Sequence, residues 1–166
     1  MVISHPAILF VEPKLNTLAP YSLVKTMRAG VLVLGPLLAK YGSAKVSLPG
    51  GCSIGSRPID LHLNALKRMG ASIKVKNGYI IASANNGLKG GLIKFPKISV
   101  GATQNILIAS CFATGKTKLR NCASEPEVQD LINFLNKLGC KIHKVGARSI
   151  DVYGVKNLKS GTHKVI

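Results

Sequence analysis

The chain has 166 residues, of which 46% are hydrophobic and only 5% aromatic. This length suits one domain or a large part of one, and the composition excludes a disordered chain. Lys and Arg total 23 against 6 Asp and Glu, so the net charge of +17 attracts anions. Nucleic acid, anionic membranes and phosphorylated small molecules all fit this charge. The lysines are scattered, however, without a dense basic run or an aromatic stripe, which disfavours nucleic acid.

The cysteines and histidines show no metal-binding pattern. No C-x-x-C pair occurs, and the histidines stand at no ligand spacing, so we expect no structural zinc and no other metal site. The chain is neither small nor rich in cysteine, which disfavours disulfides. The most apolar run, Val31 to Ala39, is too short to cross a bilayer, and no signal-peptide pattern is present. We therefore expect a cytoplasmic protein that makes no membrane contact.

The first half of the chain predicts a strand, a helix, a strand, a helix and a hairpin. Proline at the first helical turn and glycine after the last turn mark the second helix. Asn-Gly between alternating runs is the strongest short hairpin signal. The predicted ranges are Ile8–Val11, Ser22 to about Tyr41, Gly42–Leu48, Pro58 to Gly70, and the hairpin of Ser72–Lys76 and Tyr79–Ala82 around Asn77-Gly78.

The second half predicts the same order again. Its ranges are Leu92–Phe95, Gly101 to about Thr114, Gly115–Asn121, Pro126 to Gly139, and the hairpin of Lys141–Val145 and Ser149–Val152 with Gly146 in the turn. The sequence therefore predicts an α+β fold made of two βαβαββ units, approximately 1–86 and 87–166.

The two copies differ in one place. Between the second strand and the following helix, the first copy inserts Pro49–Arg57, which holds three glycines and Cys52. Glycines permit close backbone approach to a ligand and allow a loop to move. Arg57 stands just before a helix start, where backbone N–H groups favour an anion. The loop therefore indicates a site for a phosphate or carboxylate. The alternative is a structural loop with an incidental cysteine.

Two further segments are candidate anion sites. Lys97 and Ser99 precede a predicted helix start, although Ser99 reads equally well as a simple N-cap. Lys25 and Arg28 share one face of the first predicted helix, where such charges are usually solvated.

Neither His62 nor the remaining cysteines suggest chemistry. Asp60 and His62 are two apart on a helix, so they point in different directions, and we assign His62 no role. Cys111, Cys122 and Cys140 are typical of core or strand positions.

Several of these segments together closely resemble the UDP-N-acetylglucosamine enolpyruvyl transferases. The resemblance runs from about Ala19 onward. The Cys52 loop is its most specific part, since the related 5-enolpyruvylshikimate-3-phosphate synthases lack it. The matching stretches are Lys25–Gly30, Leu34–Pro36, Val46–His62, Leu88–Gly90, Lys97–Thr103 and Glu125–Glu127.

The resemblance implies the enolpyruvyl transferase fold, an inside-out α/β barrel. In that fold, two globular domains are built from six βαβαββ units around a pseudo-threefold axis. Residues 1–166 would form part of the cysteine-loop domain, with about two of its three units. The third unit and the second domain would be absent.

The resemblance also implies a reaction. The enolpyruvyl group of phosphoenolpyruvate moves to the 3′-hydroxyl of UDP-N-acetylglucosamine and phosphate is released, which is the first committed step of peptidoglycan synthesis. This implies a role in cell-wall biogenesis, and through it in cell shape and division. The reaction needs no metal or organic cofactor.

Residue roles carried over from the family centre on Cys52. It would donate a proton to the methylene carbon of phosphoenolpyruvate and be the target of fosfomycin. A thiol with a pKa of roughly 8.5 is mostly protonated at neutral pH. Arg28 and Arg57 would line the anionic site. The residues that would hold the UDP-sugar are Arg57, Pro58, Ile59, Asp60 and Leu61, together with Lys97, Ile98, Ser99 and Val100.

Parts of the family pattern are not found in this sequence. These are a lysine–asparagine pair near the N-terminus, and the catalytic aspartate and arginines of the second domain. Because the family's active site lies between domains, we expect this chain alone to be inactive and to need the remainder of the enzyme chain as its partner. Uncovered apolar faces would favour self-association. The alternative is a stand-alone basic module that binds UDP-sugars or nucleic acid without catalysis.

Overall fold

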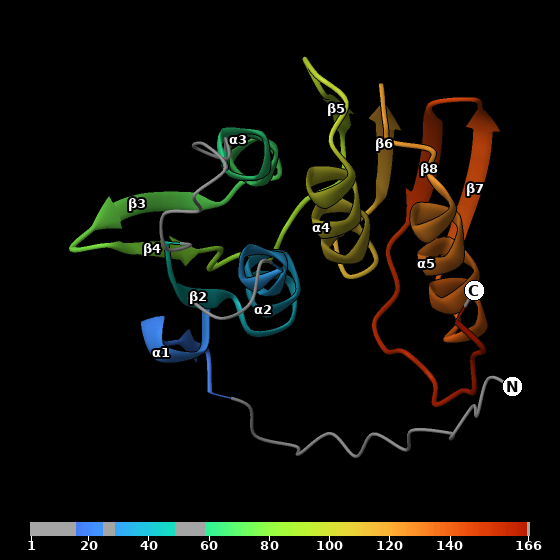
Figure 1. Cartoon of the computed structure of the whole chain (residues 1–166). Coiled ribbons are helices and arrows are strands. Elements are labelled where there is room, and N and C mark those ends of the chain that lie inside the picture. The colour runs from blue at the N-terminus through green and yellow to red at the C-terminus, as the bar shows by residue number, and fades with distance from the viewer. Residues whose placement is uncertain (1–15, 25–28, 49–58, 166) are drawn as a thin grey trace, which may run out of the picture.

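The computed structural model describes residues 16–24, 29–48 and 59–165, which form two similar repeats (Figure 1). The first repeat contains β1 (Leu18–Ala19), α1 (Tyr21–Val24), the 3-10 helix η1 (Gly30–Val33), α2 (Leu34–Tyr41), β2 (Ser43–Ser47), α3 (Asp60–Arg68), β3 (Ser72–Lys76) and β4 (Tyr79–Ser83). The second contains β5 (Leu92–Lys94), α4 (Val100–Ser110), β6 (Lys116–Arg120), α5 (Pro126–Lys137), β7 (Lys141–Gly146) and β8 (Ser149–Tyr153).

Each repeat builds a four-stranded mixed sheet of the same topology. The orders are β1-β2-β4-β3 and β5-β6-β8-β7. The first two strands of each sheet run parallel and the other pairs run antiparallel. Parallel neighbours need a crossover, and helices supply it between β1 and β2 and between β5 and β6. This confirms the predicted α+β fold with two βαβαββ repeats.

One aliphatic core runs through both repeats. Its sheet side chains are the inward-facing ones, such as Val46, Ile80 and Leu119, which are fully buried. The central element is α4, which packs against η1, α2 and α3 of the first repeat and against α5 of the second. Seven of its eleven residues are buried, as expected of a helix covered on most sides.

The first predicted helix is wrong as a single element. Among the described residues, the expected span from Ser22 to Tyr41 divides into α1, η1 and α2. A Cβ atom on Gly30 would lie 2.6 Å from Cγ1 of Val24. In one straight helix, residues six apart are separated by about 9 Å along the axis. The chain therefore folds back, and only glycine permits this contact.

Other boundaries shift by a few residues. Gly146 was expected in a turn, but it ends β7 and pairs with Ser149 across a register shift that begins at Lys144. The turn lies at residues 147–148. Helix α4 ends at Ser110 rather than near Thr114. The expected strand Ile8–Val11 lies outside the described residues, and the described strand that runs parallel to β2 is β1.

A buried carboxamide connects four elements of the core. Asn105, on α4, has no exposed surface. Its Oδ1 accepts a hydrogen bond from the backbone N–H of Gly35 at 2.9 Å. Its Nδ2 donates to the carbonyl of Val31 at 3.1 Å and to Nδ1 of His62 at 2.9 Å. One side chain therefore fixes α4 against η1, α2 and α3.

We predict that Asn105→Leu lowers the free energy of unfolding by about 3 kcal/mol or more, because buried polar partners without a hydrogen bond cost roughly 1–3 kcal/mol each. Leucine has a similar size, so the loss reports hydrogen bonding more than volume. Urea denaturation would measure it. The control is Asn133→Leu on the exposed surface of α5, where Asn133 accepts only from Gln129. Equal stability of the two variants would contradict the prediction.

Candidate functional site

The site is built around two helix starts. Helix α3 begins after Ile59, whose carbonyl accepts from the N–H groups of His62 and Leu63 at 3.0 and 3.1 Å. Helix α4 begins after Ser99, whose Oγ accepts from the N–H of Ala102 at 3.2 Å. The predicted N-cap role of Ser99 is confirmed. Backbone N–H groups of the first turn that are left without a carbonyl partner favour a bound anion.

These two helix starts lie against each other. A Cβ atom on Gly101, in the first turn of α4, would lie 3.5 Å from the ring of His62 in the first turn of α3. It would also lie 4.0 Å from the side chain of Leu32 on η1. The hydrogen bonds of Asn105 act one turn further along α4. Three segments that are far apart in the sequence therefore meet at this point.

The described candidate residues differ in exposure. Asp60, Lys97 and Ile98 are exposed, and Ile98 keeps 45% of its surface in solvent. The remaining four are partly buried: Ile59, Leu61, Ser99 and Val100. Among these, the aliphatic side chains pack on the core. The site therefore combines charged groups in solvent with apolar anchors that hold both helix starts.

Four predicted site residues lie outside the described residues, namely Arg28, Cys52, Arg57 and Pro58. The chain next to them is described. Ala29 leads into η1, and Ile59 caps α3. The two segments that carry these residues therefore join the described structure at elements that meet beside α4.

A small cavity adjoins the start of α3. It measures about 80 Å³ and lies between α3 and β5. Apolar side chains line it, including Leu61, Ile93 and Phe95, and Arg68 and Lys94 add positive charge. Pro96, which also lines it, directly precedes Lys97. The sequence analysis missed Asn64, Arg68 and Lys94 as site candidates, because the cavity joins segments about 30 residues apart and no short motif marks it.

His62 is a neutral core histidine. Burial lowers its pKa from 6.5 to about 4, because the charged ring would lose its hydration. Its Nδ1 faces the amide donor of Asn105, so Nδ1 is the acceptor and the ring proton is on Nε2. The sequence analysis assigned His62 no role, and the structure gives it a structural one. Asp60 is exposed and His62 buried, so the two do point in different directions.

The three described cysteines are core residues, as predicted. Cys111, Cys122 and Cys140 are all buried. Burial raises the pKa of the Cys122 thiol to about 11, so it stays protonated. Within residues 16–24, 29–48 and 59–165, no three His, Cys, Asp or Glu side chains gather in a way that could hold a metal ion. In those ranges no helix is both long and apolar enough to cross a bilayer.

The sequence is similar to those of known proteins. The sequence model of the family described as EPSP synthase (3-phosphoshikimate 1-carboxyvinyltransferase) matches residues 4–166. The UDP-N-acetylglucosamine 1-carboxyvinyltransferase of Pelagibacter ubique is 59% identical over 151 residues, covering 91% of this chain and 36% of that protein. The enzyme of the same name from Paramagnetospirillum magneticum is 54% identical, with 91% and 35% covered.

Solved structures share the fold. The enolpyruvyl transferase NikO from Streptomyces tendae superposes with a TM-score of 0.72 at 22% identity, covering 87% of this chain and 34% of that one. EPSP synthase from Acinetobacter baumannii gives 0.63 at 21% identity, with 80% and 30% covered.

The chain belongs to the EPSP synthase family of enolpyruvyl (1-carboxyvinyl) transferases. It spans about a third of the length of the curated relatives that it matches.

We predict that acid destabilises the fold through His62. The unfolded histidine binds a proton near pH 6.5 and the folded one only near 4, so stability falls as the pH drops through this window. The full loss is about 3 kcal/mol. Urea denaturation at pH 7, 5.5 and 4.5 would measure it. The control is His62→Gln, because glutamine does not titrate and all other titratable groups of the protein are unchanged. Identical pH dependence in both proteins would contradict the prediction.

Proposed function

We propose that this chain forms one wall of an active site that transfers enolpyruvyl from phosphoenolpyruvate to the 3′-hydroxyl of UDP-N-acetylglucosamine. The observation that carries this proposal is the meeting of the α3 and α4 starts beside η1. Those starts adjoin the segments in which the sequence matches the transferases most specifically. Relatives named as this enzyme are more than half identical over 91% of the chain.

The proposed roles of the residues are those that the resemblance to the family implies. Cys52 is the general acid that protonates the methylene carbon, while Arg28 and Arg57 bind anionic groups of the substrates. Backbone N–H groups at the α3 and α4 starts, with Lys97, favour the diphosphate. The carboxylate of Asp60 repels phosphate but accepts hydrogen bonds, so it suits N–H or O–H groups of the uridine.

The other UDP-sugar residues act through the backbone and through packing. Ile59 and Leu61 anchor the start of α3, and Ser99 caps α4. Ile98 and Val100 flank that cap, and Pro58 directly precedes Ile59. We propose that the cavity between α3 and β5 receives an apolar part of the nucleotide, because its lining includes Leu61 and Pro96, the residue before Lys97.

We propose that the repeats, approximately 1–86 and 87–166, are two of the three units of the cysteine-loop domain. The third unit and the second domain come from the remainder of the enzyme, since the chain matches only about a third of its relatives. Alone, the chain is inactive. Val75 and Leu92 keep 54% and 63% of their surface exposed, and such apolar surface favours self-association in the absence of that remainder.

The proposed reaction places the complete enzyme in cytoplasmic peptidoglycan synthesis, and thereby in cell-wall biogenesis, cell shape and cell division. Cys52 is the proposed point of attack by fosfomycin. The reaction uses no metal and no organic cofactor, because the proton donor and the anion-binding groups are all supplied by the protein.

The test is phosphate release from phosphoenolpyruvate, with and without UDP-N-acetylglucosamine, in the 166-residue chain and in the chain completed to the length of its relatives. We expect no release from the chain alone and sugar-dependent release from the completed protein. Cys52→Ala should lower that rate by at least about 100-fold, because general acid catalysis contributes this much.

The matched control is Cys140→Ala, which removes a buried thiol from the second repeat and should retain most activity. Full activity in Cys52→Ala would overturn the assigned acid. Sugar-dependent release from the 166-residue chain would overturn the half-site proposal.

A further inference from the structure

The outer face of the second sheet collects positive charge. Along β5, β6, β7 and β8, inward side chains such as Ile93, Leu119 and Val152 are buried, so their neighbours point outward. We call the charged and aromatic members of this outward set the basic face: Lys94, Lys116, Lys118, Arg120, Lys141, His143, Asp151 and Tyr153. It holds five lysine or arginine side chains and one carboxylate.

The strand register arranges these side chains in rows across the sheet. Tyr153 stands between Lys116 on β6 and Lys141 on β7. The ammonium of Lys116 lies 4.9 Å from the centroid of the Tyr153 ring. The centroids of the Tyr153 and His143 rings are 5.9 Å apart, and the two rings meet edge to face. In the next row, Asp151 stands opposite Lys118. In the first of these rows, the ring of Tyr153 therefore lies between two lysines on the neighbouring strands.

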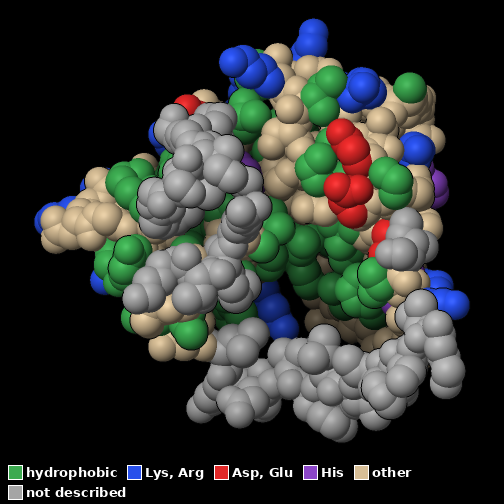
Figure 2. All heavy atoms as spheres, viewed as in Figure 1, with side chains coloured by type: hydrophobic (Ala, Val, Ile, Leu, Met, Phe, Trp, Pro, Cys, Tyr) green, Lys and Arg blue, Asp and Glu red, His purple; other side chains and the backbone are tan. Residues whose placement is uncertain are grey.

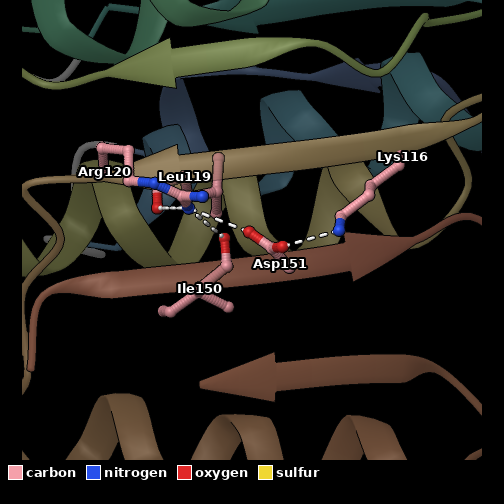
Figure 3. Close-up of polar contacts among 5 residues, drawn as sticks. All are labelled: Lys116, Leu119, Arg120, Ile150 and Asp151. Carbon is pink, nitrogen blue, oxygen red and sulfur yellow. Dashed lines mark hydrogen bonds and ion pairs between the residues drawn. The ribbon is translucent and has the colours of Figure 1, made fainter. Parts of the chain in front are cut away.

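The single carboxylate does not neutralise the surface of this face. Asp151 contacts Lys116 Nζ at 2.7 Å and Arg120 at 2.9 Å (Figure 3). Its side chain is only 9% exposed, whereas those of Lys116 and Arg120 are 35% and 29% exposed. The hydrogen bond between Asp151 and Lys116 lowers the pKa of Asp151 and raises that of Lys116, so both side chains stay charged. The cations thus cover the anion.

The remaining cations of the face have no acidic partner. Lys94, Lys118 and Lys141 are exposed, and in the described ranges no ion pair involves them. Acidic residues gather elsewhere, at the beginning of α5, as Glu125, Glu127 and Asp130. Figure 2 shows Asp and Glu side chains together over α5. Because α5 lies on the inner side of the sheet, the charges are segregated by face.

We propose that the basic face binds the phosphate backbone of single-stranded nucleic acid. Lysines on neighbouring strands match a flexible chain of phosphates, and an aromatic ring among them offers a stacking partner for a base. A single strand fits better than duplex DNA, because its unpaired bases are free to stack on an aromatic ring. This binding is separate from the transferase function.

The sequence analysis disfavoured nucleic acid because the lysines are scattered along the chain. Folding removes that objection. Lys94, Lys118 and Lys141 are more than 20 residues apart in sequence, yet they lie on one face because β5, β6, β8 and β7 pair side by side in one sheet.

The test is fluorescence anisotropy of a labelled 12-nucleotide deoxythymidine strand, titrated with the protein over a range of salt concentrations. The test variant combines Lys118→Glu and Lys141→Glu. The control combines Lys67→Glu and Lys156→Glu, which change the net charge equally at exposed positions outside the face. Both variants are first checked for an unchanged melting temperature. A second pair, Lys118→Gln with Lys141→Gln, serves if charge reversal disturbs folding.

We expect the test variant to bind at least tenfold more weakly than the control at low salt. For the test variant, the slope of log affinity against log salt concentration should also be less steep by about 1.4, since each lost phosphate contact contributes about 0.7 to that slope. Equal weakening in both variants would overturn the proposal in favour of net charge alone. Face-dependent binding to phosphatidylserine vesicles without binding to the oligonucleotide would also overturn it, in favour of a membrane.

Discussion

The arrangement of this chain depends on the side-chain amide of Asn105. It is fully buried, and its oxygen and nitrogen are both engaged. A buried amide without partners is costly, so the backbone of η1 and α2 and the ring of His62 must stay where they satisfy it. The same contacts bring the starts of α3 and α4 together. The geometry of the candidate site is thus a consequence of how the core is held.

Local signals in the sequence predicted most of the fold. Asn77 and Gly78 adopt positive φ angles of 51° and 73° in the β3–β4 turn, and Gly70 and Gly139 each reach 96° after a helix. Glycine and asparagine adopt positive φ angles more readily than other residues, so their presence predicts these turns and helix ends directly from the sequence. The break at Gly30 could not be read, because it depends on contact with a side chain six residues away.

The sequence suggested residues for the candidate site but not how they are arranged. The N-cap at Ser99 follows from local chemistry and is present. The approach of His62 to Gly101 joins positions 39 residues apart, and no local pattern announces it. The cavity beside Leu61 and the basic face are likewise products of pairing between distant segments. Arg28, Cys52, Arg57 and Pro58 lie outside the described residues, so their placement stays a prediction.

The position of α4 also bears on how the protein unfolds. Repeats in a solenoid contact only their neighbours and can melt one by one. Here the central helix of the second repeat is buried largely against helices of the first. Removing the first repeat would expose that helix and leave Asn105 without partners, and removing the second would take α4 away from η1, α2 and α3. The two copies are therefore duplicated in sequence and topology but not independent in energy, and they should be lost together in one cooperative transition.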